Sequence, residues 1–166
     1  MYKVRVILDA DDDVIRTLIV DEKFSLEKLH FDIANAFGFD GSEMASFYKS
    51  DHEWNQGKEI PLFNMAEAGE QLFMSSCITE DILPENNDKL IYVYDFLHMW
   101  TFYVEVIEIT TTPVTETKVI LSVGEIPKEA PDKVFKSDKI EDEFKDEQDD
   151  FFNDFENLDN LDFDNF

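Results

Sequence analysis

The sequence predicts an α+β fold: a β-grasp-like single domain of hairpin, helix and mixed sheet that carries an acidic aromatic C-terminal tail. Two apolar runs around an aspartate-rich turn open the chain, and an amphipathic helix follows them. Two long apolar strands occupy residues 89–110, and their β-branched content indicates a sheet. We therefore expect the helix to lie across the sheet, because each element must bury its apolar face.

The opening hairpin is predicted by the alternation of apolar and basic side chains over residues 2–8. Residues 9–13 form its turn, because aspartate side chains hydrogen-bond nearby backbone groups. This acidic run is not expected to hold a metal, since it lacks the glycine and the terminal glutamate of an EF-hand loop. Residues 14–20 return as the second strand.

The clearest helix covers residues 25–37. Ser25 is a suitable N-cap, Glu27 lies in the first turn where the helix dipole favours an acid, and Gly38 suits the C-terminal end. Four apolar residues recur at helical spacing and should face the sheet. They are Leu26, Leu29, Ile33 and Phe37.

The segment after the helix is less regular. Residues 44–49 predict a third strand, residues 54–58 a turn, and residues 59–63 a strand that pairs back. A short helix at 65–74 and a further short turn at 79–83 complete the middle of the chain.

The strongest strand patterns are those of residues 89–95 and 100–110, and the joining segment 96–99 is apolar for a loop. A last strand is expected at 118–123. The domain is therefore predicted to span residues 1–126.

The composition changes after the predicted domain. Pro127 and Pro131 punctuate a linker over residues 127–140. Residues 141–166 then form a tail with 12 acids, one lysine and six phenylalanines. Acidic–hydrophobic alternation of this kind is typical of a segment that is disordered or bound to a partner.

The overall charge excludes several kinds of partner. With 39 acids against 14 Lys and Arg the formal net charge is −25, of which residues 132–166 contribute −10. Such a chain lacks the basic surface that direct nucleic-acid binding needs, and it is equally unsuited to an anionic membrane. No membrane-spanning run or signal peptide is evident and the single cysteine fits a reducing compartment, so we expect a cytoplasmic protein.

Four segments carry a family resemblance. Residues 14–20 read VIRTLIV, residues 25–39 read SLEKLHFDIANAFGF, residues 46–48 read SFY, and residues 92–100 read YVYDFLHMW. In this order and spacing, residues 2–125 resemble the plasmid pRiA4b ORF-3-like family. The resemblance implies a compact α+β fold with a β-grasp-like core, and a domain whose biochemical function is not established.

One cluster contains side chains that could carry out acid–base chemistry. It consists of Tyr94, Asp95, His98 and Trp100, with His30 on the flank of the helix as a further candidate. An acid three residues from a histidine could raise the histidine pKa and give acid–base capacity near neutral pH. We favour the competing interpretation, in which Asp95 serves a tight turn and the aromatic residues and His30 are packing residues. No catalytic residue is therefore assigned, and neither a cofactor nor a metal is expected.

The aromatic side chains of the tail are the expected partner-binding residues, together with Tyr94 and Trp100. They are Phe151, Phe152, Phe155, Phe163 and Phe166. They could dock into a basic or apolar groove of a protein partner, while the acids steer the encounter. The alternatives are a solubilising tail, and a tail that contacts its own domain or a second copy.

The sequence thus predicts a non-enzymatic, cytoplasmic protein-interaction module that uses its tail. One alternative is a small-ligand-binding or hydrolytic domain that uses the loop from Tyr94 to Trp100. A further alternative is an acidic mimic of nucleic acid, whose carboxylates occupy a DNA-binding protein. The sequence does not define the oligomeric state.

Overall fold

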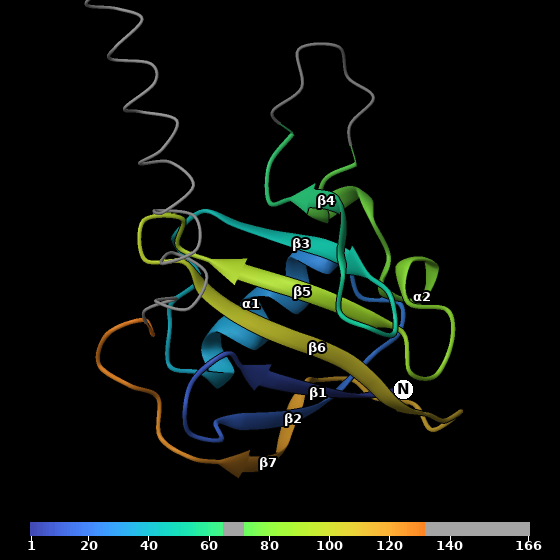
Figure 1. Cartoon of the computed structure of the whole chain (residues 1–166). Coiled ribbons are helices and arrows are strands. Elements are labelled where there is room, and N and C mark those ends of the chain that lie inside the picture. Colours follow the sequence, from blue (N-terminus) through green and yellow to red (C-terminus); the bar gives the residue numbers. More distant parts are fainter. Residues whose placement is uncertain (65–71, 132–166) are drawn as a thin grey trace, which may run out of the picture. The chain divides into compact units, whose positions relative to one another are not determined.

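The computed structural model describes residues 1–64 and 72–131, which form one seven-stranded sheet with a helix packed against it (Figure 1). The strand order is β4-β3-β5-β6-β1-β2-β7. The elements are β1 (Tyr2–Leu8), β2 (Ile15–Val20), α1 (Leu26–Ala36), β3 (Ala45–Ser50), β4 (Gln56–Pro61), the 3₁₀ helix η1 (Met74–Ser76), α2 (Thr79–Ile82), β5 (Lys89–Tyr94), β6 (Trp100–Ile109) and β7 (Lys118–Val123).

The predicted β-grasp-like α+β fold with a mixed sheet is wrong. Every neighbouring pair of described strands is antiparallel, and the described α-helices are α1 and the four-residue α2. β6 lies between β5 and β1 and runs antiparallel to both. The physical reason for the error is that alternation along a strand identifies its buried face, but not its direction relative to a neighbour.

Most individual elements agree with their predictions. The helix predicted at 25–37 is confirmed. So are the strands predicted at residues 2–8, 14–20, 44–49, 89–95, 100–110 and 118–123. β4 begins at Gln56, inside the segment predicted as a turn. The helix predicted at 65–74 falls mainly on residues 65–71, which lie outside the described residues, and its last residue belongs to η1. The predicted domain boundary at residue 126 stays a prediction, and the compact described unit continues to Pro131.

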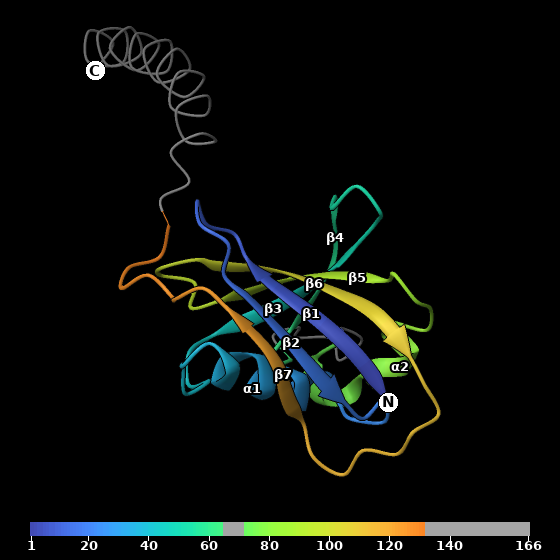
Figure 2. The ribbon, with the colours of Figure 1, turned by 90° about the horizontal axis from the view of Figure 1, so that it is seen from below.

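The core lies between α1 and one face of the sheet (Figure 2). Along β1 the buried residues alternate with partly exposed ones, so that one face of the strand packs into the core. The helix begins where Ser25 Oγ accepts a hydrogen bond from the Lys28 N–H at 3.1 Å, which confirms the predicted N-cap. Its stripe of Leu26, Leu29 and Ile33 is fully or almost fully buried.

The segment from η1 to α2 closes the N-terminal end of α1. The Leu26 N–H donates to the Cys77 carbonyl at 2.9 Å, and Thr79 Oγ1 donates to the Phe24 carbonyl at 2.7 Å. One of the helix's otherwise unpaired N–H groups is thereby satisfied by a distant segment of the chain.

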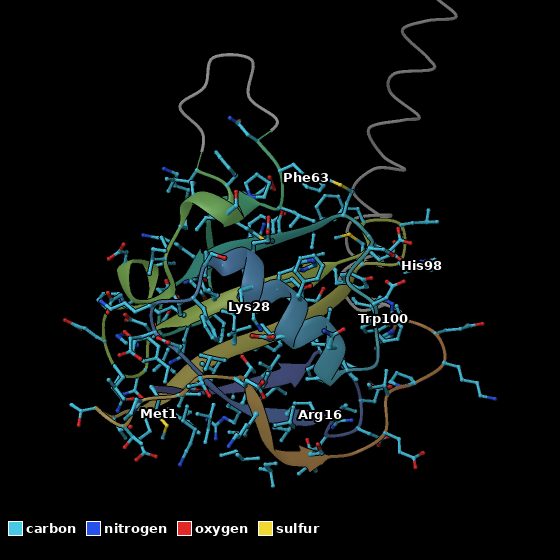
Figure 3. The ribbon with its side chains drawn as sticks, turned by 180° about the vertical axis from the view of Figure 1, so that it is seen from behind. Met1, Arg16, Lys28, Phe63, His98 and Trp100 are labelled. Atoms are coloured by element: carbon cyan, nitrogen blue, oxygen red, sulfur yellow. The ribbon has the colours of Figure 1, made fainter. Side chains whose placement is uncertain are left out.

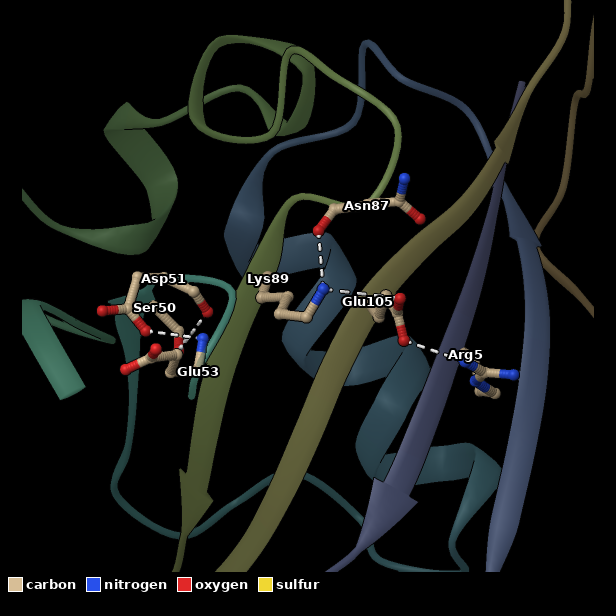
Figure 4. Close-up of polar contacts among 7 residues, drawn as sticks. All are labelled: Arg5, Ser50, Asp51, Glu53, Asn87, Lys89 and Glu105. Atoms are coloured by element: carbon tan, nitrogen blue, oxygen red, sulfur yellow. Dashed lines mark hydrogen bonds and ion pairs between the residues drawn. The ribbon is translucent and has the colours of Figure 1, made fainter. Parts of the chain in front are cut away.

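The opposite face of the sheet carries charged side chains, which Figure 4 shows, and also aromatic rings. Glu105 on β6 pairs with Arg5 on β1 at 2.9 Å and with Lys89 on β5 at 3.5 Å. The Lys89 ammonium also lies 5.3 Å from the ring centroid of Trp54, whose ring meets Tyr103 edge-on. These cross-strand pairs hold three central strands in register on the side away from α1.

Arg16 on β2 is a buried cation that joins three parts of the fold. Its side chain is in the α1-side layer and is 9% exposed. Nε donates to the Ala36 carbonyl at the end of α1 at 3.2 Å, Nη1 to the Val123 carbonyl at 2.9 Å, and Nη2 to the Gly124 carbonyl at 3.2 Å. The guanidinium carbon lies 5.2 Å from the Phe37 ring centroid. The helix end, β2 and the end of β7 are therefore fastened to one side chain.

We expect Arg16→Met to lower the free energy of unfolding by about 2–3 kcal/mol, because carbonyl groups lose a charged donor in a buried place. Arg16→Lys should recover only part of this loss, since an ammonium cannot reproduce the planar fork of donors. Urea unfolding of the full chain measures both. The control is Arg5→Met, which removes a half-exposed ion pair and should cost less than about 1 kcal/mol. Equal losses for the two methionine variants would contradict this role of Arg16.

Candidate functional site

The candidate site lies at the turn that joins β5 to β6, residues 95–99. The two strands pair up to Tyr94↔Trp100, so the turn is closed tightly. Asp95 and Met99 both have a left-handed backbone, with φ of 61° and 56°. The N–H groups of His98 and Met99 donate to the Asp95 carbonyl at 3.1 and 2.6 Å. Asp is one of the few residue types other than glycine that adopt this conformation readily, which is a backbone reason for Asp95.

Asp95 and His98 form a carboxylate–imidazole pair across this turn. His98 Nδ1 lies 2.6 Å from Asp95 Oδ2, and the Leu97 N–H donates to Oδ1 at 3.1 Å. Partial burial acts to raise the pKa of Asp95, but the hydrogen bonds from His98 and the Leu97 N–H outweigh it, so the pKa lies below its usual value. The His98 side chain is 59% exposed, on the outside of the turn, with Trp100 closer to the sheet (Figure 3). The pair is thus accessible to solvent.

His30 is placed elsewhere, inside the core. It is fully buried on α1, its Nδ1 lies 2.5 Å from Tyr92 Oη, and its Nε2 lies 3.1 Å from the Gly41 carbonyl oxygen. Because a carbonyl only accepts, Nε2 carries the proton and Tyr92 donates to Nδ1. Burial lowers the pKa of His30, and only the Gly41 carbonyl opposes this, while burial raises the pKa of Tyr92. His30 therefore holds α1, β5 and the Gly41 loop together as a neutral residue.

Tyr94 and Trp100 are buried beneath the turn. The Phe39 ring lies between them, with its centroid 5.0 Å from each of theirs. Tyr94 Oη donates to Asp40 Oδ1 at 3.3 Å. The His30 and Tyr94 ring centroids are 6.1 Å apart. The structure thus brings the aromatic pair together through Phe39, which the sequence reasoning did not select although it follows Gly38 in the family motif.

The turn exposes three apolar side chains to solvent. Phe96 is 43% exposed, Leu97 is 85% exposed and Met99 is 46% exposed. We call these three residues the apolar tip. The sequence signal for the apolar tip was the apolar composition of residues 96–99, which is unusual for a connection between strands.

The remaining candidate residues belong to the predicted tail. Phe151, Phe152, Phe155, Phe163 and Phe166 lie outside the described residues. Within residues 1–64 and 72–131, no three His, Cys, Asp or Glu side chains gather closely enough to hold a metal ion. No helix in the same ranges has the length and apolar character to cross a membrane.

The comparisons with known proteins point to a family and a fold. The family model described as "Plasmid pRiA4b ORF-3-like protein" matches residues 1–165, a longer range than the 2–125 that the motifs carried. The crystal structure of a protein of unknown function, MM3350 from Methanosarcina mazei Go1, is similar with a TM-score of 0.60 at 16% identity. The similarity covers 87% of this chain and 81% of that one, and at this identity it shows the fold alone. No curated protein matches.

The buried state of His30 predicts a specific pH dependence of stability. Because its pKa in the folded chain lies below the ordinary 6.5, only the unfolded chain takes up the proton readily just below pH 6.5. The free energy of unfolding should therefore fall as the pH drops through 6.5 towards the lower, folded pKa. Urea unfolding between pH 7.5 and 5 measures this dependence, with the pH values chosen to bracket the ordinary histidine pKa of about 6.5.

His30→Gln should lower the stability and flatten its dependence on pH, since glutamine does not titrate. The matched control is His52→Gln, which makes the same substitution at an exposed position and leaves the buried His30 in place. The same slope in the wild type and in His30→Gln would show that His30 does not titrate as its burial requires.

Proposed function

Because the chain belongs to the plasmid pRiA4b ORF-3-like family, in which no biochemical activity is established, we propose a function from its own surfaces: it is a non-enzymatic protein-interaction module. The proposed location is the cytoplasm. The observation that carries the proposal is the apolar tip, three neighbouring apolar side chains held in water by an ordered turn.

The order of the turn is what makes the apolar tip suitable for binding. The Asp95 carbonyl accepts two backbone N–H groups and its carboxylate accepts a third, so the turn has little freedom left to lose. A preorganised apolar surface binds with a small entropic cost, and the gain comes from burying Leu97 and its neighbours. The partner surface that fits is an apolar groove.

The tail supplies the second proposed contact. Its phenylalanines are interspersed with acids, and residues 132–166 carry a net charge of −10. Acids attract a basic partner surface over a distance, and aromatic side chains contribute apolar burial once they dock. We therefore propose a partner whose groove is apolar with a basic rim.

The Asp95–His98 pair supports a second candidate function, a small-ligand-binding or hydrolytic domain. The 2.6 Å contact and the exposure of His98 make an imidazole available at the surface. The two functions depend on different residues. His98→Ala would abolish ligand binding, whereas substitutions in the apolar tip would leave ligand binding unchanged.

We expect Leu97→Ser combined with Met99→Ser to reduce the capture of protein partners by at least about tenfold, as for residues at the centre of an interface. The measurement is affinity capture by the full chain, followed by titration of the purified partner. Ile109→Ser is the matched control, because it removes an exposed aliphatic side chain at the far end of β6. Unchanged capture by the double variant would contradict the proposal.

The tail is tested in the same full chain by changing Phe151, Phe152 and Phe155 to serine. The partner's dissociation rate should rise, because apolar contacts act mainly on dissociation. Asn153→Ser with Asn157→Ser is the control, since it changes the same segment without removing an aromatic ring. If the phenylalanine variant binds as tightly as its control, the tail acts only through its charge.

A further inference from the structure

A second surface of the domain lies at the edge strand β7. Among the described residues, the backbone of β7 pairs only with β2, and β7 is the last strand of the sheet (Figure 1). Four of its side chains are aliphatic and 38–49% exposed, namely Val119, Ile120, Leu121 and Val123. Edge strands are usually protected by charges, prolines or a covering element. β7 has a single charge, Lys118. Its register with β2 shifts between Leu121 and Val119, and it presents backbone groups and apolar side chains to a further strand.

An acidic cleft begins directly beyond the C-terminal end of β7. It has a volume of about 520 Å³ and lies between the β1–β2 turn and residues 125–131. Four carboxylates line it, and one ammonium, that of Lys128. The carboxylates are Asp11, Asp12, Glu125 and Glu129. Val14, Ile126 and two prolines add apolar surface. Such a lining fits the aliphatic stem and the charged end of a lysine or arginine side chain.

The cleft is preformed, because its two walls are fastened together. Gly124 has φ of 76°, and a Cβ atom at this position would lie 2.0 Å from the Asp13 carbonyl oxygen. Only glycine permits this approach of two backbones. Arg16 Nη2 donates to the Gly124 carbonyl at 3.2 Å and fixes the same point from below.

The charges favour a partner other than a second copy of the chain. Pairing of two copies of β7 would bring together two chains that each carry a net charge of −25, and such like charges repel. A strand with basic residues at the position facing the cleft meets no such repulsion.

We propose that β7 accepts an extended segment of a partner protein as an antiparallel eighth strand, and that a lysine or arginine of this segment lies in the acidic cleft. The antiparallel direction continues the pattern of the whole described sheet and is slightly the more stable one. In an antiparallel pair, the C-terminal end of β7 at Val123 lies beside the N-terminal end of the added strand. The partner residues that reach the cleft are therefore those that precede the partner's strand. The basic residue therefore stands on the N-terminal side of an alternating β-branched run. This inference rests on the proposed interaction function and assigns a partner chemistry to a surface separate from the apolar tip.

The test uses two labelled peptides of identical composition and the full chain. In the first, Lys-Arg-Gly precedes Thr-Val-Thr-Val-Thr-Val; in the second, the same residues stand in reverse order, so that the basic end follows the strand. Fluorescence anisotropy should show the first peptide binding at least about fivefold more tightly, as expected when close charge pairs form in only one orientation. Equal binding would show a response to net charge alone and would overturn the proposal, as would no binding of either peptide.

Two further arms test the cleft and the strand separately. The double variant Glu125→Gln with Glu129→Gln should weaken binding of the first peptide by about threefold or more. The control Glu53→Gln with Glu85→Gln makes an equal charge change at exposed sites elsewhere and should leave this binding unchanged. Two N-methylated forms of the first peptide are compared, one with all valines and one with all threonines methylated. Only one of the two should lose binding, because alternate N–H groups of a strand face the same neighbour and only one set can pair with β7. If both methylated peptides bind, strand pairing is excluded.

Failure of this inference is distinguishable from failure of the proposed function. If the apolar-tip variant loses its partners but the full chain binds both peptides equally, the interaction function stands and the β7 site does not. If the full chain prefers the first peptide but the apolar-tip variant keeps all partners, the β7 site stands and the proposed tip contact does not.

Discussion

The arrangement of the domain depends on the need to satisfy one buried cation, the guanidinium of Arg16. Removing a guanidinium from water is costly unless acceptors surround it. Here the acceptors are backbone carbonyls, at Ile15, Ala36, Val123 and Gly124. Because the C-terminal end of a helix carries partial negative charge, the end of α1 is a favourable neighbour. The helix and the last strand are consequently held at fixed positions relative to β2.

This constraint also shapes the surfaces available for function. With the end of β7 held by Arg16 and Gly124 against the β1–β2 turn, residues 125–131 leave the sheet at a defined point and form one wall of the acidic cleft. The β5–β6 turn lies at the same end of the sheet, since β6 begins where β1 ends. His30 and Tyr92 stabilise the other side of α1 through a neutral hydrogen bond. The buried polar contacts of Arg16 and His30 thus add directed hydrogen bonds to an apolar core, while the exposed turn and edge carry apolar groups.

The elements and the site differ in how far the sequence could predict them. Periodicity identified α1 together with its N-cap, and the strand boundaries of β1, β5 and β6, because these depend on local spacing and on turn residues. The role of Asp95 in a turn is equally local, and its contact with His98 spans three residues. By contrast, β4 occupies residues of low strand propensity, and its formation depends on the neighbouring β3 rather than on its own composition.

The sequence by itself determined the family, the order of the main elements, the apolar stripe of α1 and the change to an acidic, phenylalanine-rich composition after residue 140. These features depend on composition and on spacings of a few residues. Only the tertiary structure decided the direction of the strands, the burial of His30 against Tyr92, the four acceptors of Arg16 and the cleft beside β7. Each of these joins residues far apart in the chain, and such contacts are selected by the packing of the whole sheet rather than by any local pattern.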